Sequence, residues 1–249
     1  MGLPRVSVVV PCYNYRRFLS DSVGSVLGQE GVDLEVVIVD DASSDGSVDL
    51  ANEIATKDSR VRVLEHKHNV GHIATYNEGL AAATGDYLVL LSADDMLTGG
   101  SLLRATALME ANPSVGMTYG RVIQLRTATP PPARVGRIRW RVWKGADWLA
   151  LRATSVRNVI MCPEVVMRAD AYRNVGPYRA DLPHSGDFAM WLAAATVADV
   201  GFVGGCDQAY YRVHGQNMHM TTFDIDKDDG LLSDLTYRSM AFEAVLPTA

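Results

Sequence analysis

The first 120 residues alternate between two kinds of segment, and this alternation constrains the possible folds more than any other feature of the chain. Short runs of β-branched and aliphatic residues have the length of strands, and apolar residues recur at helical spacing between them. Strands that are apolar throughout and separated by helices are typical of a parallel sheet covered on both faces. The sequence therefore predicts an α/β protein. The expected strands are Val6–Val10, Leu34–Val39, Val61–Leu64 and Tyr87–Leu91, and the expected helices are Phe18–Leu27, Ser47–Thr56 and Ile73–Ala83.

Beyond residue 120 the pattern changes. A proline-rich loop at 127–134 precedes arginines that alternate with apolar residues over 137–142, the period-two pattern of a half-exposed strand. Residues 121–144 contain seven Lys or Arg and no acid, so we expect an edge strand whose charge prevents unwanted pairing. Further elements are expected at Ser101–Ala111 (helix), Val115–Leu125 (strand), Phe188–Ala198 (buried helix) and Leu231–Val245 (amphipathic helix).

Composition favours a folded protein and disfavours two classes of function. The 249 residues are 48% hydrophobic and 21% charged, which is typical of a chain that buries a core. The net charge of −6 argues against a nucleic-acid-binding protein, because such proteins carry positive charge to neutralise phosphates. The apolar stretch Phe188–Ala198 is shorter than the ~20 residues of a membrane-spanning helix, so no transmembrane segment is expected.

The cysteines bear on the cellular setting. Cys12, Cys162 and Cys206 are odd in number and far apart, so they fit neither a disulfide framework nor a zinc site. We expect a reducing, cytoplasmic setting, and a peripheral association with a membrane stays open. The oligomeric state is not indicated by the sequence.

Polar residues follow three of the expected strands at the point where each strand ends. The first strand leads into Pro11–Asn14, the second into Asp40-Asp41 and the fourth into Asp94-Asp95. In an open parallel sheet these ends lie along one edge, where ligands bind. Adjacent carboxylates repel each other unless a cation lies near them, and Mg²⁺ or Mn²⁺ prefers oxygen ligands and bridges carboxylates to phosphates.

A simpler interpretation exists for part of this pattern. Ser44, Asp45 and Gly46 have the composition of a turn that caps the following helix, and we interpret them so. For Asp41 and for Asp94-Asp95, which lie beside strands without a basic neighbour in sequence, we favour a functional role.

Four motifs in this order and spacing resemble the family 2 glycosyltransferases, densely over residues 5–115 and in patches to about residue 220. The resemblance implies a GT-A fold and sugar transfer from a nucleotide-diphosphate sugar with inversion. It also implies one GT-A domain over 1–249, with a nucleotide-sugar-binding part at 1–120, an acceptor-side and catalytic-base part at 121–225 and a C-terminal helix at 226–249. The motifs are Val6–Asn14, Val37–Gly46, Asn69–Gly71 and Gly85–Tyr87 leading to Ser92–Asp95.

The resemblance implies roles for individual residues of the first part. Pro11 and Tyr13 would line the nucleobase pocket, and Asp41 would hydrogen-bond the base. Asp94 would bind ribose or share in metal binding, and Asp95 would coordinate Mn²⁺ or Mg²⁺ under the diphosphate. Many family members have an acid where this chain has Ser92, which leaves the division of labour between the two carboxylates open.

Two residues of the second part complete the expected site. An inverting transfer needs a base for the acceptor hydroxyl, and the family pattern of an acid before an aromatic-rich helix falls on Asp187. Capping of that helix is the alternative role of Asp187. His214, in Tyr210–Asn217, resembles a late family motif that completes the metal shell or contacts the diphosphate, and the sequence does not choose between these roles.

Two other functions involve a similar nucleotide-binding sheet. A sugar nucleotidyltransferase would need a glycine-rich basic loop after the first strand, which Pro11–Asn14 does not provide. A degenerate sugar-nucleotide-binding domain is compatible with Ser92. The expected partners are a UDP-, dTDP- or GDP-sugar and an acceptor hydroxyl on a glycan, a lipid-linked intermediate or a small molecule. The arginine-rich strand at 137–142 is a candidate to flank the acceptor groove.

Overall fold

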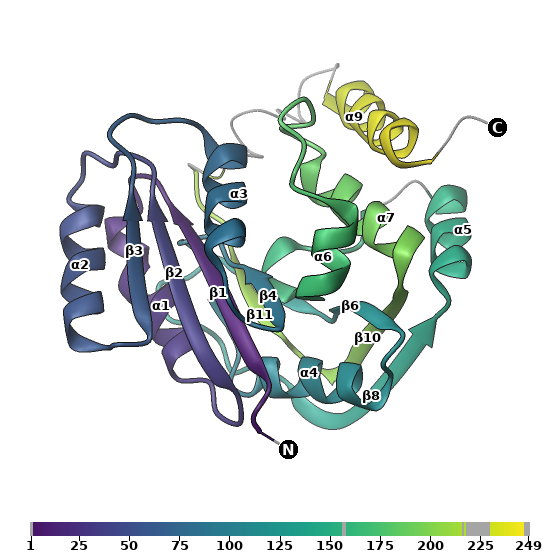
Figure 1. Cartoon of the computed structure of the whole chain (residues 1–249), viewed down its shortest axis with the longest axis horizontal. Helices are drawn as coiled ribbons and strands as arrows, with labels where there is room; N and C mark the ends of the chain where they lie inside the picture. Colours follow the sequence, from purple (N-terminus) through teal and green to yellow (C-terminus); the bar gives the residue numbers. More distant parts are fainter. Residues whose placement is uncertain (1, 156–157, 216, 218–229, 247–249) are drawn as a thin grey trace.

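The computed structural model describes residues 2–155, 158–215, 217 and 230–246, and its centre is a twisted sheet (Figure 1). Within these residues the eight strands have the order β3-β2-β1-β4-β9-β6-β10-β8. The first four are parallel, whereas β9 and β8 run antiparallel to their neighbours. The mostly parallel α/β sheet is as expected. The strands are β1 (Arg5–Cys12), β2 (Asp33–Asp40), β3 (Val61–Glu65), β4 (Tyr87–Leu90), β6 (Val115–Tyr119), β8 (Val135–Trp143), β9 (Val166–Arg168) and β10 (Asp199–Cys206).

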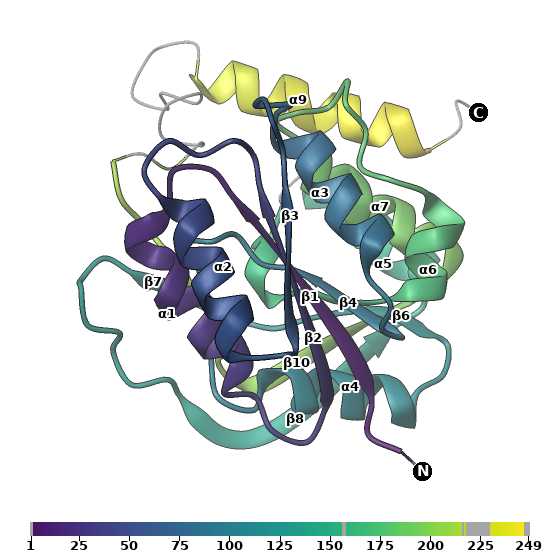
Figure 2. The same ribbon diagram turned by 60° about the vertical axis from the view of Figure 1, so that its left-hand side comes forward.

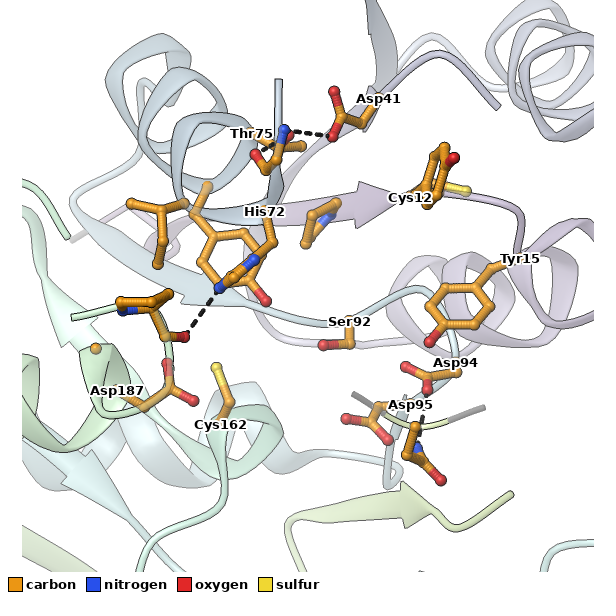
Figure 3. A pocket seen from close by; sticks show the side chains of 18 of the residues that line it. Cys12, Tyr15, Asp41, His72, Thr75, Ser92, Asp94, Asp95, Cys162 and Asp187 are labelled. Atoms are coloured by element: carbon orange, nitrogen blue, oxygen red, sulfur yellow. Dashed lines mark hydrogen bonds between the residues drawn. The ribbon is translucent and has the colours of Figure 1, made fainter. Parts of the chain in front are cut away.

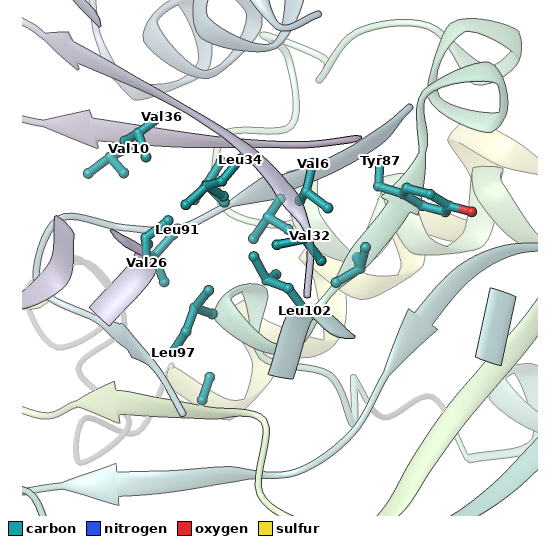
Figure 4. Close-up of a cluster of buried hydrophobic side chains, with 14 of the residues drawn as sticks. Val6, Val10, Val26, Val32, Leu34, Val36, Tyr87, Leu91, Leu97 and Leu102 are labelled. Carbon is teal, nitrogen blue, oxygen red and sulfur yellow. The ribbon is translucent and has the colours of Figure 1, made fainter. Parts of the chain in front are cut away.

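Helices cover both faces of this sheet, which explains why the strands are apolar throughout (Figure 2). In β1, Val8 and Val10 pack into the cluster of one face (Figure 4), whereas Val9 packs into the cluster of the other. The first face carries α1 (Arg16–Leu27), α2 (Ser47–Lys57) and α4 (Ser101–Ala111). The second carries α3 (His72–Ala82), α5 (Gly145–Ser155), α6 (Ala169–Val175), α7 (Gly186–Val197) and α9 (Gly230–Val245).

The late helices agree with the sequence analysis. α7 begins two residues before the expected buried helix, and α9 matches the expected terminal helix. Part of the expected C-terminal segment, 226–229 and 247–249, lies outside the described residues. Within the described residues, no helix combines the length and the hydropathy needed to cross a bilayer.

The expected single strand over Val115–Leu125 is two strands in two sheets, which corrects that prediction. It divides at Gly120, where a side chain would collide with Gln208 Cγ. The chain then leaves the large sheet and joins a three-stranded sheet of order β5-β11-β7. In this small sheet β11 lies beside β5, and β5 begins directly after Asp95. Its strands are β5 (Met96–Leu97), β7 (Val122–Leu125) and β11 (Ala209–Arg212).

The arginine-rich segment forms β8, an edge strand as expected, paired with β10 among the described residues. It is not half-exposed, however, because both of its faces are open to solvent. Ile138 and Trp140 are 47% and 46% exposed. Alternation predicts which residues share a face of a strand, but it does not predict whether another element packs on that face.

Candidate active site

A cavity of about 490 Å³ lies at the carboxyl ends of β1, β2 and β4, and the first turn of α7 closes its other side (Figure 3). Six of the predicted site residues line it. The edge of the parallel sheet brings the early motifs together, and α7 adds the late carboxylate. The six residues are Pro11, Tyr13, Asp41, Asp94, Asp95 and Asp187.

Asp94 and Asp95 are buried side by side and are held by the segment that contains β11. The backbone N–H of Arg212 donates to Asp95 Oδ1 at 2.8 Å, and Arg212 Nε donates to the Asp94 carbonyl oxygen at 2.8 Å. Asn217 Nδ2 donates to Asp94 Oδ2 at 3.3 Å. Burial and the neighbouring charge of Asp94 raise the pKa of Asp95 well above its usual range. A cation beside the pair would relieve both effects.

The chemistry of this pair fits a divalent metal that shares its coordination with a ligand. Within the described residues, no group of three or more His, Cys, Asp or Glu side chains is placed to hold a metal alone. Two carboxylates opening into a cavity suit Mg²⁺ or Mn²⁺, since such ions take their remaining ligands from water and substrate phosphates.

His214 lies next to the acidic pair. Its Nε2 is 3.0 Å from Asp94 Oδ2. The ring packs against Phe18 and Tyr15, with centroid distances of 5.0 and 5.8 Å. The imidazole therefore contacts one of the expected metal ligands and is fixed by aromatic neighbours.

Asp41 occupies the opposite wall of the cavity and is held as an anion. Its Oδ1 accepts from the Val70 backbone N–H at 2.8 Å, and its Oδ2 accepts from the Gly71 N–H at 3.0 Å. His66 Nδ1 is 2.8 Å from Oδ1. Burial raises the pKa of Asp41, but the hydrogen bonds from His66, Val70 and Gly71 outweigh burial and hold it below its usual value.

The turn after β2 behaves as the simpler interpretation expected. Asp45 Oδ1 accepts from the Ser47 N–H at 2.9 Å at the start of α2, and Oδ2 accepts from the Arg16 N–H at 2.9 Å at the start of α1. Ala42 and Asn14 adopt left-handed φ angles of 61° and 59°. Such conformations are unusual for residues with side chains and are held here by the surrounding turn.

Asp187 is the second residue of α7 and lies in its first turn, whereas the sequence pattern placed it just before the helix. A helix N-terminus favours the charged carboxylate, so helix capping alone would lower its pKa. Burial of the carboxyl group acts in the opposite direction and raises the pKa of Asp187 to about 6. A carboxylate with a pKa near the working pH suits a general base.

The cavity contains residues to which the sequence analysis assigned no role. His72 lines it and its Nε2 is 3.0 Å from the Pro183 carbonyl oxygen, and Cys162 lies between the acidic pair and Asp187 (Figure 3). Arg212 and Asn217 belong to the same motif as His214, and the sequence indicates no role of their own for them. His66 has no sequence signal, because nothing local indicates the register of β2 and β3 that places it beside Asp41. His219 lies outside the described residues.

None of the residues that line the cavity in the described part of the chain comes from β8. In Figure 1, β8 lies at the end of the molecule opposite the carboxyl ends of β1 and β2. The structure thus gives no support to the idea that the arginine-rich strand flanks an acceptor groove.

Residues 7–165 match the sequence model of the family described as glycosyl transferase family 2. The chain belongs to this family. An uncharacterized glycosyltransferase of Haemophilus influenzae is 26% identical over 222 residues, which are 85% of this chain and 66% of that protein. The chain thus spans about two thirds of the length of this glycosyltransferase relative.

Solved structures show that this family 2 glycosyltransferase has the GT-A fold. S. aureus TarS 1–349 in complex with UDP-GlcNAc aligns with a TM-score of 0.69 at 19% identity, over 88% of this chain and 61% of TarS. The mannosyltransferase PcManGT from Pyrobaculum calidifontis, in complex with GDP-Man and Mn²⁺, aligns with a TM-score of 0.64 at 16% identity. The alignment covers 100% of this chain and 77% of PcManGT.

Proposed function

We propose that this family 2 glycosyltransferase is an inverting enzyme with Asp187 as the general base. The acceptor hydroxyl oxygen forms a bond to the anomeric carbon of the donor sugar, and the bond between that carbon and the diphosphate oxygen breaks. The hydroxyl proton passes to the Asp187 carboxylate, and the nucleoside diphosphate leaves. Attack opposite the leaving group inverts the configuration at the anomeric carbon.

One observation carries this proposal: Asp187 shares the cavity with the Asp94-Asp95 pair but belongs to a different element. The base of a displacement must approach from the side away from the leaving group. Burial raises the pKa of Asp187 to about 6, so it is ionised near neutral pH and still basic enough to accept a proton.

The diphosphate side is assigned to Asp94 and Asp95, with His214 contacting Asp94. These residues would hold Mn²⁺ or Mg²⁺, which when bound stabilises the negative charge of the departing diphosphate. Arg212 holds this segment in place, because its backbone N–H donates to the Asp95 carboxylate and its Nε donates to the backbone carbonyl oxygen of Asp94.

The donor nucleotide is assigned to the wall formed by Pro11, Tyr13 and Asp41. The structural neighbours bind UDP-GlcNAc and GDP-Man, so both UDP- and GDP-sugars are candidate donors. Thermal-shift measurements with UDP-, dTDP- and GDP-sugars plus Mn²⁺ will identify the nucleobase of the donor. Donor hydrolysis by the purified protein will separate an enzyme from a domain that only binds.

The base assignment predicts that Asp187→Asn reduces transfer by about 10²- to 10⁴-fold, the usual contribution of a general base. Nucleotide-sugar affinity should change little, because the amide keeps the shape of the carboxylate. Turnover with the best donor and the dissociation constant of that donor are measured in parallel.

Asp181→Asn is the matched control, since Asp181 is an exposed carboxylate paired with Arg179 at the surface. It should transfer sugar at the wild-type rate. Near-normal turnover by Asp187→Asn would exclude this residue as the base.

The metal assignment predicts that Asp95→Ala weakens nucleotide binding by about ten-fold or more in Mn²⁺, the loss of one charged contact. In EDTA the same variant should bind almost as the wild type does. Calorimetry in both buffers measures the difference, with the exposed Asp33→Ala as control. Equal losses in both buffers would argue against metal ligation by Asp95.

A further inference from the structure

His66 joins two carboxylates from different elements behind the nucleotide wall. Its Nδ1 is 2.8 Å from Asp41 Oδ1, and its Nε2 is 2.6 Å from Glu78 Oε2 on α3. The imidazole side chain is only 9% exposed, whereas Glu78 is 51% exposed. The backbone fixes the arrangement, because the His66 N–H donates to the Asp40 carbonyl oxygen at 2.9 Å.

Only the protonated ring satisfies both contacts. A neutral imidazole has one N–H and can donate to one carboxylate, whereas the imidazolium donates to both. Burial lowers the pKa of His66, but the bonds to Asp41 and Glu78 outweigh burial and raise it above the usual value.

Among the described residues, no other cationic side chain contacts the His66 ring. The loop after β2 presents Asp41 and helix α3 presents Glu78. Of its chain neighbours, Glu65 accepts from Asn52 Nδ2 on α2 at 2.6 Å, and Lys67 is exposed. The charge of the imidazolium is thus shared between the two carboxylates.

We propose that His66, held between Asp41 and Glu78, is a positioning residue for recognition of the donor nucleotide. This inference rests on the proposed function, in which Asp41 contacts the base. The imidazolium fixes the direction of the Asp41 carboxylate. Two of the Asp41 contacts besides His66 are backbone N–H groups, so His66 is the part of the support that can titrate.

The charge of the group also changes when His66 titrates. With His66 protonated, the three side chains carry a net charge of −1, and with His66 neutral they carry −2. The second state repels the diphosphate more strongly, and Glu78 is free to turn toward solvent. Donor affinity should therefore fall as pH rises through the pKa of His66.

The test compares wild type with His66→Gln, using UDP with Mn²⁺ and, in a second series, GDP with Mn²⁺. At each pH, the dissociation constant of the variant is divided by that of the wild type for the same nucleotide. This ratio removes the titration of the nucleotide itself. We expect His66→Gln to bind about five-fold more weakly at pH 6, the effect of one charge across roughly 10 Å at intermediate dielectric. The ratio should approach one above the pKa of His66, where the wild-type ring is neutral.

His68→Gln is the matched control, since His68 is an exposed histidine of the same loop, and it should follow the wild type at every pH. In Glu78→Gln, the loss of one carboxylate lowers the pKa of His66, so the decline in affinity should move to lower pH. Glu78 does not line the cavity, and its exposure makes misfolding of this variant a minor concern.

A second readout is the NMR titration of the His66 ring. Because binding and protonation are linked, protonation of His66 strengthens nucleotide binding by some factor, and bound UDP or GDP should lower the acid dissociation constant of His66 by the same factor, which raises its pKa. A pH-independent ratio for His66→Gln together with an unchanged ring titration would overturn the inference. Failure of the wild type to bind either nucleotide would remove the proposed function, and this inference with it.

Discussion

The carboxyl groups of three residues in one cavity differ in pKa because each has different neighbours. Hydrogen bonds from backbone N–H groups and His66 lower the pKa of Asp41. Burial raises the pKa of Asp187, and burial together with a charged neighbour raises that of Asp95. The contrast matches the proposed division of labour, in which Asp41 accepts a hydrogen bond, Asp95 needs a cation and Asp187 takes a proton.

The pKa of Asp187 predicts the acidic limb of the activity profile. Its carboxyl group is protonated below about pH 6 and cannot accept the acceptor proton there. At saturating donor, kcat should fall about ten-fold per pH unit below this value, as for a single ionisation. Measuring kcat rather than kcat/KM separates this limb from donor binding. A rate that stays constant from pH 7 to pH 5 would contradict the role of Asp187.

The sequence predicted that Asp41, Asp94 and Asp95 lie along one edge of the sheet, because each follows an apolar strand, whereas Asp187 was predicted from the family resemblance. It did not identify His66 as a neighbour of Asp41. That contact depends on the parallel register of β2 and β3, which pairs Asp40 with Glu65 and so places Asp41 and His66 side by side. Register between strands is a tertiary relation. The raised pKa of Asp187 was also beyond the sequence, because burial depends on elements that are distant in the chain.

At the scale of elements, close contact between α3 and the sheet positions the nucleotide wall. A side chain at Gly79 would overlap Val9 Cγ1 and lie 2.9 Å from Val39 Cγ2. Both neighbours are β-branched and stiff, so they cannot move aside easily. The missing side chain lets α3 approach β1 and β2, which brings Glu78 to His66.

Gly79→Ala should therefore destabilise the protein by about 1–3 kcal/mol, the usual effect of overpacking a core. Gly24→Ala in α1 is the matched control, since a side chain there meets nothing within 4 Å. It should stabilise the protein by about 0.5–1 kcal/mol through the helix preference of alanine. Equilibrium urea unfolding of both variants measures the difference, and equal effects would contradict the packing argument.

The boundaries of elements were predictable where apolar runs end in polar residues, as in β1 to β4. They were not predictable at Gly120, where a segment with the composition of a single strand crosses from one sheet to another. The approach of Gln208 explains the break, and Gln208 is far away in sequence.

At the scale of the whole molecule, one sheet unites the two parts that the sequence separates near residue 120. β4 of the first part pairs with β9 of the second, and β9 pairs with β6. Strands of both parts thus belong to one continuous sheet of eight strands among the described residues, rather than to two units joined by a linker. The sequence predicted one domain from length and resemblance, and the shared sheet is the physical reason to propose it.

This continuity predicts a single cooperative unfolding transition. The four tryptophans, Trp140, Trp143, Trp148 and Trp191, all lie in the second part. Far-UV circular dichroism reports on the whole chain, so coincident fluorescence and dichroism transitions in urea would show that both parts unfold together. Separated midpoints would contradict the one-domain proposal.

The exposed edge of β8 has a consequence for the behaviour of the protein in concentrated solution. The unpaired edge of a strand is a template for intermolecular β-sheet growth, and the exposed Ile138 and Trp140 would favour such aggregation. In an antiparallel pairing of two copies, the row Arg137, Arg139 and Arg141 would face its own like charges. The arginines therefore act as gatekeepers that keep neighbouring molecules apart, and this surface should be most adhesive at high ionic strength, where their repulsion is screened.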